Sequence, residues 1–380
     1  MDISTPLTGL VLTGGGARGA YQAGVLSAIG DILKSENLEN PFKVITGNSA
    51  GSINAAYLAA NIDNVHSAAN TIRSLWESIH TEHVFRVDSL SLFRITLRWL
   101  YELTSGKLSG KKKARALLDT SPLYDLLSSK VPFYQIQHQI DTGQLHSLGI
   151  TAVNYSTGTS KTFFQGHPSI DPWHRMRRRS ERTLIETDHI MASTALPLLF
   201  PPIKIKDRYY GDGSLRNYTP LSPAIKLGAS KLLVIGVRRP EKDPHDINEL
   251  ERARTKPTLA RTLGVIFNTV LLDAIDFDYE RISRINHTLS SINDHSHTQL
   301  KPIDVFMIRP SQDLGIIAAE ECHEMPSTLG HLMHGLGSNT EAADLISYVL
   351  FENGYTKRLI KLGYADTLNR KKELLEFMRP

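Results

Sequence analysis

The sequence predicts an α/β fold in which helices cover a central, mostly parallel sheet, followed by a helical C-terminal extension. Two observations support this prediction. Residues 7–13 form a short apolar run that ends in glycines and leads into apolar residues at helical spacing, as expected for a buried strand followed by a helix. Residues 43–46 repeat the pattern and are followed by GNSAG and a helix of small residues. Strand, glycine-rich turn and helix in succession are typical of a doubly wound sheet.

Length and composition limit the class of protein. The chain has 380 residues, of which 41% are hydrophobic and 22% charged, which is typical of a folded globular protein. The formal net charge of +4 is too small to identify a nucleic-acid or membrane partner on its own. Cys322 is the only cysteine, so an intrachain disulfide and a thiolate metal cluster are excluded.

No segment has the ~20 uninterrupted apolar residues that a membrane span needs. The most apolar later stretch, residues 265–277, is interrupted by Asn268, Asp273 and Asp276. The N-terminus has no basic leader, and its apolar run is too short for a signal sequence. We therefore expect a cytoplasmic protein or one that associates peripherally with a membrane.

The pattern of strands and helices continues along the chain. Further strands are expected over residues 149–155, 161–165, 232–237 and 304–308. We expect residues 1–310 to form the main domain, with a helical, basic insertion at about 80–118, and residues 311–380 to form the helical extension. From residue 340 onward the sequence predicts two or three amphipathic helices, with Asp366 and Thr367 as caps of the last one.

The segment Gly47-Asn48-Ser49-Ala50-Gly51 matches the pattern G-x-S-x-G. On a tight turn from strand to helix, this pattern exposes a strained serine hydroxyl, and the flanking glycines let the backbone pack without a clash. The following helix directs its positive N-terminal dipole at the serine. So short a pattern also occurs by chance. Its position between an apolar strand and an alanine-rich helix favours Ser49 as a nucleophile.

Residues 14–19, GGGARG, form a second glycine-rich loop between a strand and a helix. The backbone N–H groups of Gly14, Gly15 and Gly16 are candidates for an oxyanion hole, and Arg18 for stabilising the turn or adding positive potential. The loop also contains G-x-G-x-x-G, the dinucleotide-binding pattern, but the second strand runs into GNSAG without the carboxylate that such a site needs. A tight turn without a ligand is the third interpretation.

A serine nucleophile needs a base. Asp212 lies between Gly211 and Gly213 directly after an aromatic run, and these glycines permit close approach of the backbone to another loop. An aspartate before a glycine is more commonly part of an ordinary turn. We expect Asp212 to lie beside Ser49 as its base.

Together, in this order, the three motifs GGGARG, GNSAG and DGS (residues 212–214) resemble those of patatin-like phospholipases. Residues 192–203 also resemble the family's segment before the aspartate, residues 120–127 and 219–229 resemble bacterial members, and the resemblance extends over residues 7–237. Ser214 stands where the family usually has Gly or Ala, which leaves Asp212 in place. Thr13 stands where plant members carry an acid, so plant substrate preferences are not expected here.

The resemblance implies a three-layer sandwich and a Ser49–Asp212 dyad that needs no histidine. It also implies hydrolysis of phospholipids or other fatty acyl esters through an acyl-enzyme intermediate, of phospholipase A or lysophospholipase type, without cofactor or metal. Two related functions stay open. An acyltransferase would pass the acyl group to an acceptor other than water, and a non-catalytic relative would only bind lipid.

Histidines offer two further alternatives. Seven of them follow Asp212, which is the chain order of a Ser–His–Asp triad. They are His245, His287, His295, His297, His323, His331 and His334. Three of these, His323, His331 and His334, are close enough in sequence to suggest a metal site, although such histidines are more commonly surface or core residues.

Two basic clusters are candidate contact sites for a negatively charged partner. The first, Lys111–Lys113 with Arg115, follows an amphipathic stretch that carries Trp99, and we interpret residues 90–115 either as a lid or docking element for an anionic membrane or as a packed insertion helix. The second contains Arg175, Arg177–Arg179 and Arg182. We expect no nucleic-acid binding, because neither cluster has interleaved aromatic residues.

Overall fold

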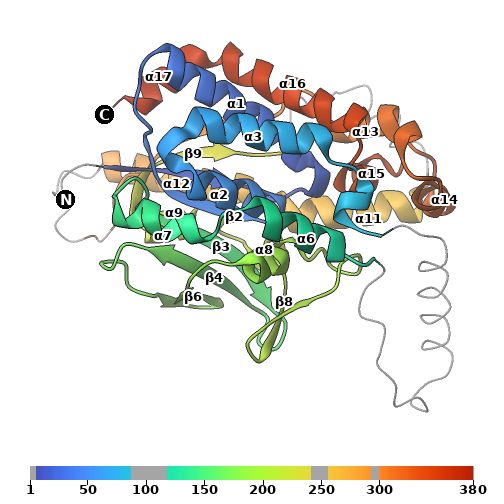
Figure 1. The fold of residues 1–380 in the computed structure, drawn as a ribbon, viewed down its shortest axis with the longest axis horizontal. Coiled ribbons are helices and arrows are strands. Elements are labelled where there is room, and N and C mark those ends of the chain that lie inside the picture. The colour runs from blue at the N-terminus through green and yellow to red at the C-terminus, as the bar shows by residue number, and fades with distance from the viewer. Residues whose placement is uncertain (1–5, 87–117, 241–255, 292–297, 299, 380) are drawn as a thin grey trace.

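The computed structural model describes residues 6–86, 118–240, 256–291, 298 and 300–379. It confirms an α/β fold around one mixed sheet of ten strands in the order β10-β9-β1-β2-β3-β4-β6-β5, with the hairpin β7–β8 joined to β3 (Figure 1). All six predicted strands are present. They are β1 (Leu7–Leu12), β2 (Phe42–Asn48), β3 (Ser147–Asn154), β4 (Thr159–Gly166), β9 (Ala229–Ile235) and β10 (Asp304–Ile308).

The pairing of neighbouring strands changes from parallel to antiparallel at β3. From β10 to β3 every neighbouring pair is parallel, whereas β4 runs antiparallel to β3. Four short strands were not predicted: β5 (His174–Arg175), β6 (Arg178–Arg182), β7 (Ile203–Ile205) and β8 (Arg208–Asp212). Strands β5 and β6 consist mainly of exposed or half-buried charged residues, β7 has only three residues, and β8 is buried only over its last three. They therefore lack the longer apolar run or alternation that reveals a strand in sequence.

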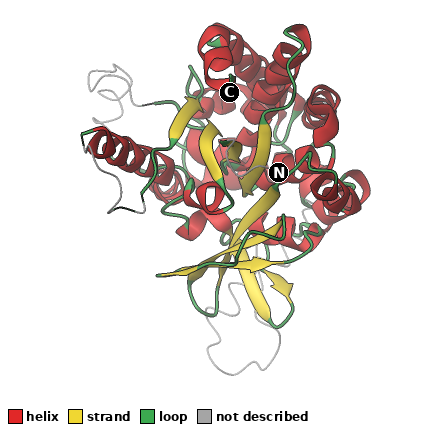
Figure 2. Cartoon of the chain, turned by 90° about the vertical axis from the view of Figure 1, so that its left-hand side faces the viewer, coloured by secondary structure: helices red, strands yellow, loops and turns green. Residues whose placement is uncertain are grey.

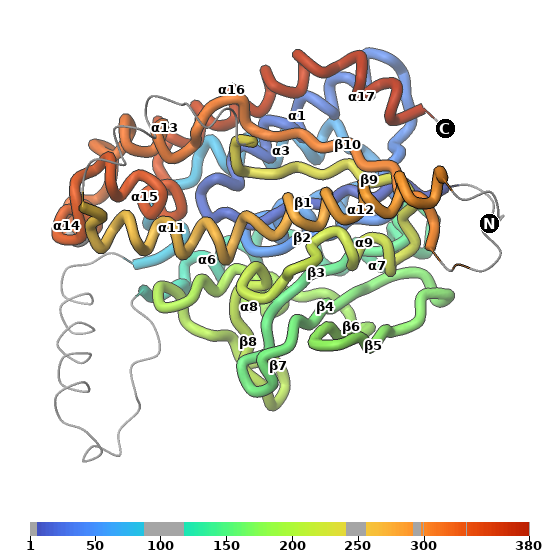
Figure 3. The backbone as a smooth tube through the Cα atoms, turned by 180° about the vertical axis from the view of Figure 1, so that it is seen from behind, coloured from blue at the N-terminus to red at the C-terminus, as the bar shows by residue number. Residues whose placement is uncertain are grey.

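Helices cover both faces of the twisted sheet, which gives three layers (Figure 2). On one face the larger core cluster joins the sheet to α1 (Gly19–Ser35), α2 (Ala50–Ala60) and α3 (Val65–Ser78). On the other face a smaller cluster joins it to α9 (Ser222–Lys226) and α12 (Ala274–Ser290), which lie in front in Figure 3. The other described α-helices are α4 (Thr81–Val84), α6 (Ser121–Lys130), α7 (Tyr134–Asp141), α8 (Thr187–Thr194), α11 (Leu259–Leu271), α13 (Leu314–Glu321), α14 (Ser327–Leu336), α15 (Ala343–Val349), α16 (Asn353–Asn369) and α17 (Lys371–Met378).

The C-terminal helix α16 lies along α1 (Figure 1). The two backbones approach each other closely at glycines: a Cβ atom on Gly24 would lie 2.0 Å from the Ile360 carbonyl oxygen, and one on Gly363 would lie 2.2 Å from that of Tyr21. The Tyr21 hydroxyl also donates to the Asp366 carboxylate at 3.0 Å. The helical C-terminal region therefore packs directly on the first helix of the sheet domain. The proposed division at residue 310 stays a prediction.

The predicted caps Asp366 and Thr367 are wrong. Both lie inside α16, and the last helix begins later, at Lys371. Asp366 is buried and accepts hydrogen bonds from the Tyr21 hydroxyl and the Ser311 N–H, while the Thr367 hydroxyl donates to the Gly363 carbonyl. A tertiary partner thus takes the Asp366 side chain, and the Thr367 hydroxyl bonds back to a carbonyl of its own helix, so neither side chain is free to cap the next helix.

The insertion predicted at about 80–118 falls mainly outside the described residues, which leave out 87–117. The lid or docking hypothesis for residues 90–115, with Lys111–Lys113 and Arg115, therefore stays a prediction. Within the described ranges, none of the helices combines the length and the apolar character that crossing a bilayer would require.

Candidate active site

The G-x-S-x-G segment forms the predicted turn from strand to helix. Ser49 follows β2 directly and has φ 51° and ψ −134°, a conformation that is strained for a residue with a side chain. A Cβ atom on Gly47 would lie 2.6 Å from the Gly51 carbonyl oxygen, and one on Gly51 would lie 2.3 Å from that of Leu12. Both glycines are therefore required by close backbone contacts. Helix α2 begins at Ala50, so its N-terminus faces the serine.

Asp212 lies beside Ser49. The Ser49 hydroxyl donates a hydrogen bond of 2.6 Å to Asp212 Oδ2. Sheet topology explains the approach: on β3, Thr151 pairs with Asn48 of β2, and the next residue, Ala152, pairs with Asp212 of β8. Strand β8 thus takes over the edge of β3 where β2 ends, and brings its last residue to the serine turn.

The pair is almost completely shielded from solvent, with Ser49 2% and Asp212 0% exposed. Burial raises the pKa of Asp212 to about 6, because desolvation penalises the charged carboxylate. Hydrogen bonds from the Ser49 hydroxyl and from Ser214 oppose this rise. A carboxylate with a pKa near 6 is ionised at neutral pH and is a stronger base than an ordinary aspartate.

The glycine-rich loop lies directly against the serine. A Cβ atom on Gly14 would be 2.7 Å from the Ser49 Cβ atom, and Gly15 and Gly16 have φ values of 154° and 57°. No described residue accepts a hydrogen bond from the N–H groups of Gly14, Gly15 or Gly16. The residue of the loop that contacts Ser49 is Gly14, and its N–H, like those of Gly15 and Gly16, has no described acceptor. The second strand ends in Asn48, so the described site lacks the carboxylate that a dinucleotide-binding loop needs there.

The Arg18 side chain points toward the C-terminal helices. Its Nε donates to the Ser347 hydroxyl at 2.8 Å, its Nη2 lies 3.1 Å from Asp344 Oδ1, and its guanidinium carbon lies 4.7 Å from the centre of the Tyr348 ring. All three partners belong to α15. The Tyr348 carbonyl also packs where Gly16 would carry a side chain, 2.2 Å from that Cβ position. Of the two roles considered for Arg18, these contacts favour stabilisation of the turn.

Sequence reasoning assigned no role in the site to three polar residues that the structure places there. The Ser193 hydroxyl accepts a hydrogen bond from the Ser49 N–H at 3.0 Å and donates to the Thr151 carbonyl at 2.7 Å. Asn48 donates to the Ser214 hydroxyl at 2.9 Å, and the Ser214 N–H donates to Asp212 Oδ1 at 2.8 Å. Ser193 lies in the segment 192–203 that resembles the family, which was the only sequence signal for it.

No described histidine bonds to Ser49 or Asp212. His287, His323, His331 and His334 are exposed on the surface, and the other three candidates, His245, His295 and His297, lie outside the described residues. The hydroxyl of Ser49 is already bonded to a carboxylate. The described part of the chain therefore favours a dyad over a triad.

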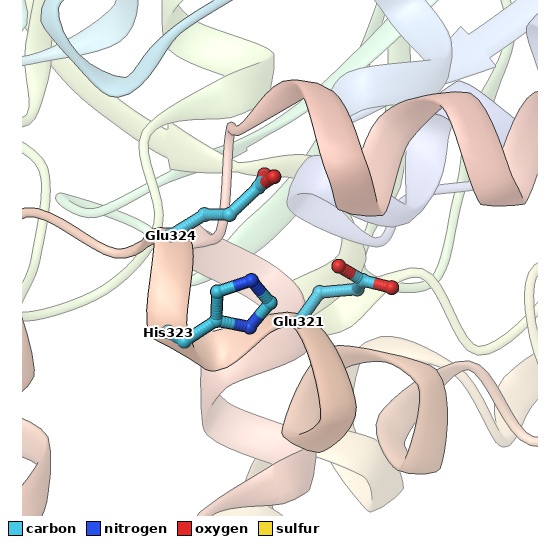
Figure 4. A group of neighbouring side chains, drawn as sticks. All are labelled: Glu321, His323 and Glu324. Atoms are coloured by element: carbon cyan, nitrogen blue, oxygen red, sulfur yellow. The ribbon is translucent and has the colours of Figure 1, made fainter.

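The histidine metal site that was considered as an alternative does not form among the described residues. His331 and His334 each bond through Nδ1 to a backbone carbonyl of their own helix. His323 instead lies near Glu321 and Glu324, with one potential ligand atom of each within 4.8 Å of the others (Figure 4). Glu321 accepts from Arg358 at 2.7 Å and Glu324 accepts from the Gly354 N–H at 2.7 Å. Both carboxylates thus have protein partners, and this exposed group supports no metal assignment.

Comparison with known proteins agrees with the motifs. The model of the family described as "Patatin-like phospholipase" matches residues 10–225. A "cGAMP-activated phospholipase" of Pseudomonas aeruginosa is 30% identical over 213 residues, which are 56% of this chain and 53% of that protein. The chain therefore spans about half the length of this curated relative.

Two solved structures are also similar. Human GIVD cytosolic phospholipase A2 is 14% identical, with a TM-score of 0.45 over 100% of this chain and 60% of that chain. VipD from Legionella pneumophila is 12% identical, with a TM-score of 0.38 over 97% and 67%. Because these TM-scores are low, family membership depends on the sequence match. That match covers more than half of the chain, including all three motifs, and the chain belongs to the patatin-like phospholipase family.

Proposed function

We propose that this chain is a lipid acyl hydrolase that cleaves fatty acyl esters with Ser49 as nucleophile and Asp212 as base. The observation that carries the proposal is the 2.6 Å hydrogen bond from the hydroxyl of Ser49, on its strained turn, to the buried Asp212 carboxylate. A nucleophile held by a base within hydrogen-bond distance is the arrangement that acyl transfer requires. Family membership supports a lipid ester as substrate.

In the proposed reaction, the Ser49 oxygen attacks the ester carbonyl carbon while Asp212 accepts its proton. The N–H groups of Gly14, Gly15 and Gly16 stabilise the oxyanion, assisted by the N-terminus of α2. Asp212 then gives the proton to the departing alcohol, which leaves the acyl group on Ser49. A water molecule, deprotonated by Asp212, attacks the acyl-enzyme, and Asp212 returns this proton to the Ser49 oxygen as the fatty acid is released. Arg18 acts by holding the glycine turn against α15.

The proposed substrate is a phospholipid or lysophospholipid presented at a lipid surface, to which the protein would bind peripherally. An acyltransferase would use the same dyad and differ only in the acceptor, so the products separate the two functions. A non-catalytic lipid-binding protein would not need the bonded pair of Ser49 and Asp212. The pair therefore favours catalysis.

The shielding of Ser49 and Asp212 favours an enzyme that opens before it acts, because an ester cannot reach a serine that is only 2% exposed. The Pseudomonas aeruginosa relative is named for activation by cGAMP. We propose that this chain likewise depends on an activating event, which a nucleotide or a lipid surface would supply. Assays should therefore include cGAMP and lipid vesicles as separate additions.

The test compares the wild type with Ser49→Ala on a p-nitrophenyl fatty acyl ester and on a phospholipid. We expect the wild type to release fatty acid and to form a covalent adduct at Ser49 with an alkyl fluorophosphonate, which intact-mass spectrometry would detect. The folded Ser49→Ala variant should do neither. Full activity in Ser49→Ala would refute the proposal, and transfer of the acyl group to an added alcohol in preference to water would identify an acyltransferase.

The rate should depend on pH through Asp212. A base works only when it is deprotonated, and burial holds the pKa of this carboxyl at about 6. We expect kcat/KM to be half-maximal near pH 6, to fall about tenfold per pH unit below that value, and to reach a plateau above it. Initial rates on the soluble ester between pH 4.5 and 8 would measure this. A profile that is flat across pH 5 to 7 would contradict the assignment of Asp212 as base.

A further inference from the structure

The second basic cluster lies on the hairpin β5–β6. The turn of this hairpin lies at the same end of the strands as the dyad. Residues that pair across neighbouring strands connect the two sites. Asp212 on β8 pairs with Ala152 on β3, which pairs with Lys161 on β4, and Lys161 pairs with Arg179 on β6. Three strand spacings of about 4.8 Å put the Arg179 backbone roughly 14 Å from that of Asp212. The hairpin turn, at residues 176–177, therefore projects from the edge at which Ser49 lies.

The structure divides the arginines of this cluster into two groups. Arg178 donates to the Thr219 hydroxyl at 2.5 Å, and Arg182 donates to the Gly166 carbonyl at 2.7 Å, so these two hold the hairpin to the domain. Arg175, Arg177 and Arg179 are exposed, and none of them forms an ion pair or side-chain hydrogen bond with a described residue. Three cations are thus available to an external partner.

The tip of the hairpin combines charge with an apolar side chain. Met176 is 89% exposed and lies between Arg175 and Arg177. The tip is held in place, because the Ser160 N–H donates to the Arg177 carbonyl at 3.0 Å. Tyr218, which directly precedes the partner of Arg178, is 68% exposed. An exposed Met and Tyr among cations suit the boundary between headgroups and acyl chains.

The sequence around this hairpin is one of two basic stretches of the chain, the other being residues 90–115 with seven Lys and Arg and one Glu. Residues 155–220 contain ten Lys and Arg and six Asp and Glu, a net charge of +4. The sector that includes the hairpin and Asp212 would therefore be attracted to an anionic surface.

We propose that the tip of the β5–β6 hairpin, formed by Arg175, Met176, Arg177 and Arg179, docks on an anionic phospholipid surface. The arginines bind lipid phosphates and Met176 inserts among the acyl chains. Because the tip and the dyad share one edge of the sheet, docking brings the membrane to the catalytic edge. The most exposed apolar side chain of the tip, that of Met176, can insert among acyl chains but offers no ring on which a base could stack, which favours lipid over nucleic acid. Its catalytic relevance rests on the proposed function, but the docking itself does not.

The test measures binding of the full chain carrying Ser49→Ala, so that hydrolysis does not alter the membrane. Co-sedimentation would use vesicles of phosphatidylcholine alone and vesicles with added phosphatidylglycerol, at low and high salt. In this background we compare Arg175→Glu/Arg177→Glu/Arg179→Glu and Met176→Gln. The matched control is Lys357→Glu/Lys361→Glu/Lys372→Glu, which makes the same charge change at exposed lysines of α16 and α17, on the opposite side of the molecule (Figures 1 and 3).

We expect binding only to the anionic vesicles, and loss of binding at high salt. The arginine variant should bind on the order of 100-fold more weakly, which corresponds to about 1 kcal/mol for each cation, and Met176→Gln about fivefold more weakly. The lysine control should bind like its parent. The proposal is overturned if the arginine variant keeps its affinity for anionic vesicles or if the lysine control loses as much affinity as the arginine variant. It is also overturned if the parent does not bind anionic vesicles. Tighter binding to a single-stranded oligonucleotide at the same salt, lost in the arginine variant, would assign the tip to nucleic acid instead.

Discussion

Replacing Asp212 by asparagine should lower kcat on a fatty acyl ester by about 10³- to 10⁴-fold, because the amide cannot accept the proton of Ser49. The two residues are joined by a hydrogen bond of 2.6 Å, and the described site offers no histidine to replace the base. Steady-state rates at pH 8 would measure the loss. Activity within tenfold of the wild type would show that another group deprotonates Ser49.

The same substitution should increase the stability of the folded protein at neutral pH. Burial raises the pKa of Asp212 from 3.8 to about 6. The folded state therefore holds the proton more tightly than the unfolded state does, and the wild type loses stability as the pH rises from about 4 to 6. The loss reaches about 3 kcal/mol above pH 6. Asparagine has no charge to bury, so the Asp212→Asn variant does not lose this stability as the pH rises.

Denaturant unfolding at several pH values would measure this effect. The free energy of unfolding of Asp212→Asn should exceed that of the wild type by an amount that grows from pH 4 to 6 and is constant above pH 6. Asp207→Asn is a suitable control, because the Asp207 side chain is 84% exposed and its replacement should change stability by less than about 0.5 kcal/mol at any pH. A difference that shrinks with rising pH would contradict the buried, proton-holding carboxylate.

The substitution Gly24→Ala should destabilise the protein by about 3 kcal/mol. A methyl group at this position would lie 2.0 Å from the Ile360 carbonyl oxygen, so α1 and α16 would have to move apart and lose packing along their contact. The gain in helix propensity, up to about 1 kcal/mol, offsets only part of the cost. Thermal and urea unfolding would measure the change.

Gly330→Ala provides the matched control. Gly330 also lies within a helix, α14, but a Cβ atom there would have no neighbour within 4 Å. Alanine should therefore stabilise the protein by a few tenths of a kcal/mol to about 1 kcal/mol. If Gly24→Ala were as harmless as Gly330→Ala, the close approach of α1 and α16 would be refuted, and with it the view that the C-terminal helices are part of the core.

Much of the architecture could be predicted because its signals are local. The six predicted strands have five to eight residues, and each contains a short hydrophobic run. The turn at Ser49 and the loop at residues 14–16 could be recognised for a similar reason. Their conformations require glycine at particular positions, and a glycine pattern can be read directly from sequence.

Other features depend on contacts between distant parts of the chain. Arg18 follows the glycine loop in sequence, yet its guanidinium binds Asp344 and Ser347, more than 300 residues away. Ser193 supports the Ser49 N–H only because α8 packs beside the end of β3. Asp366 had the sequence context of a cap and instead binds Tyr21 of another helix. Nothing local to these residues identifies their partners.

The sequence by itself determined the class of fold, the nucleophile turn and the candidate base, because backbone conformation and hydrophobic periodicity depend on neighbouring residues. Only the tertiary structure decided how Ser49 and Asp212 meet and how completely they are buried. It also decided which arginines of the β5–β6 hairpin are free. Distances and desolvation depend on the packing of strands that are far apart in the chain, and the raised pKa of Asp212 follows from that burial.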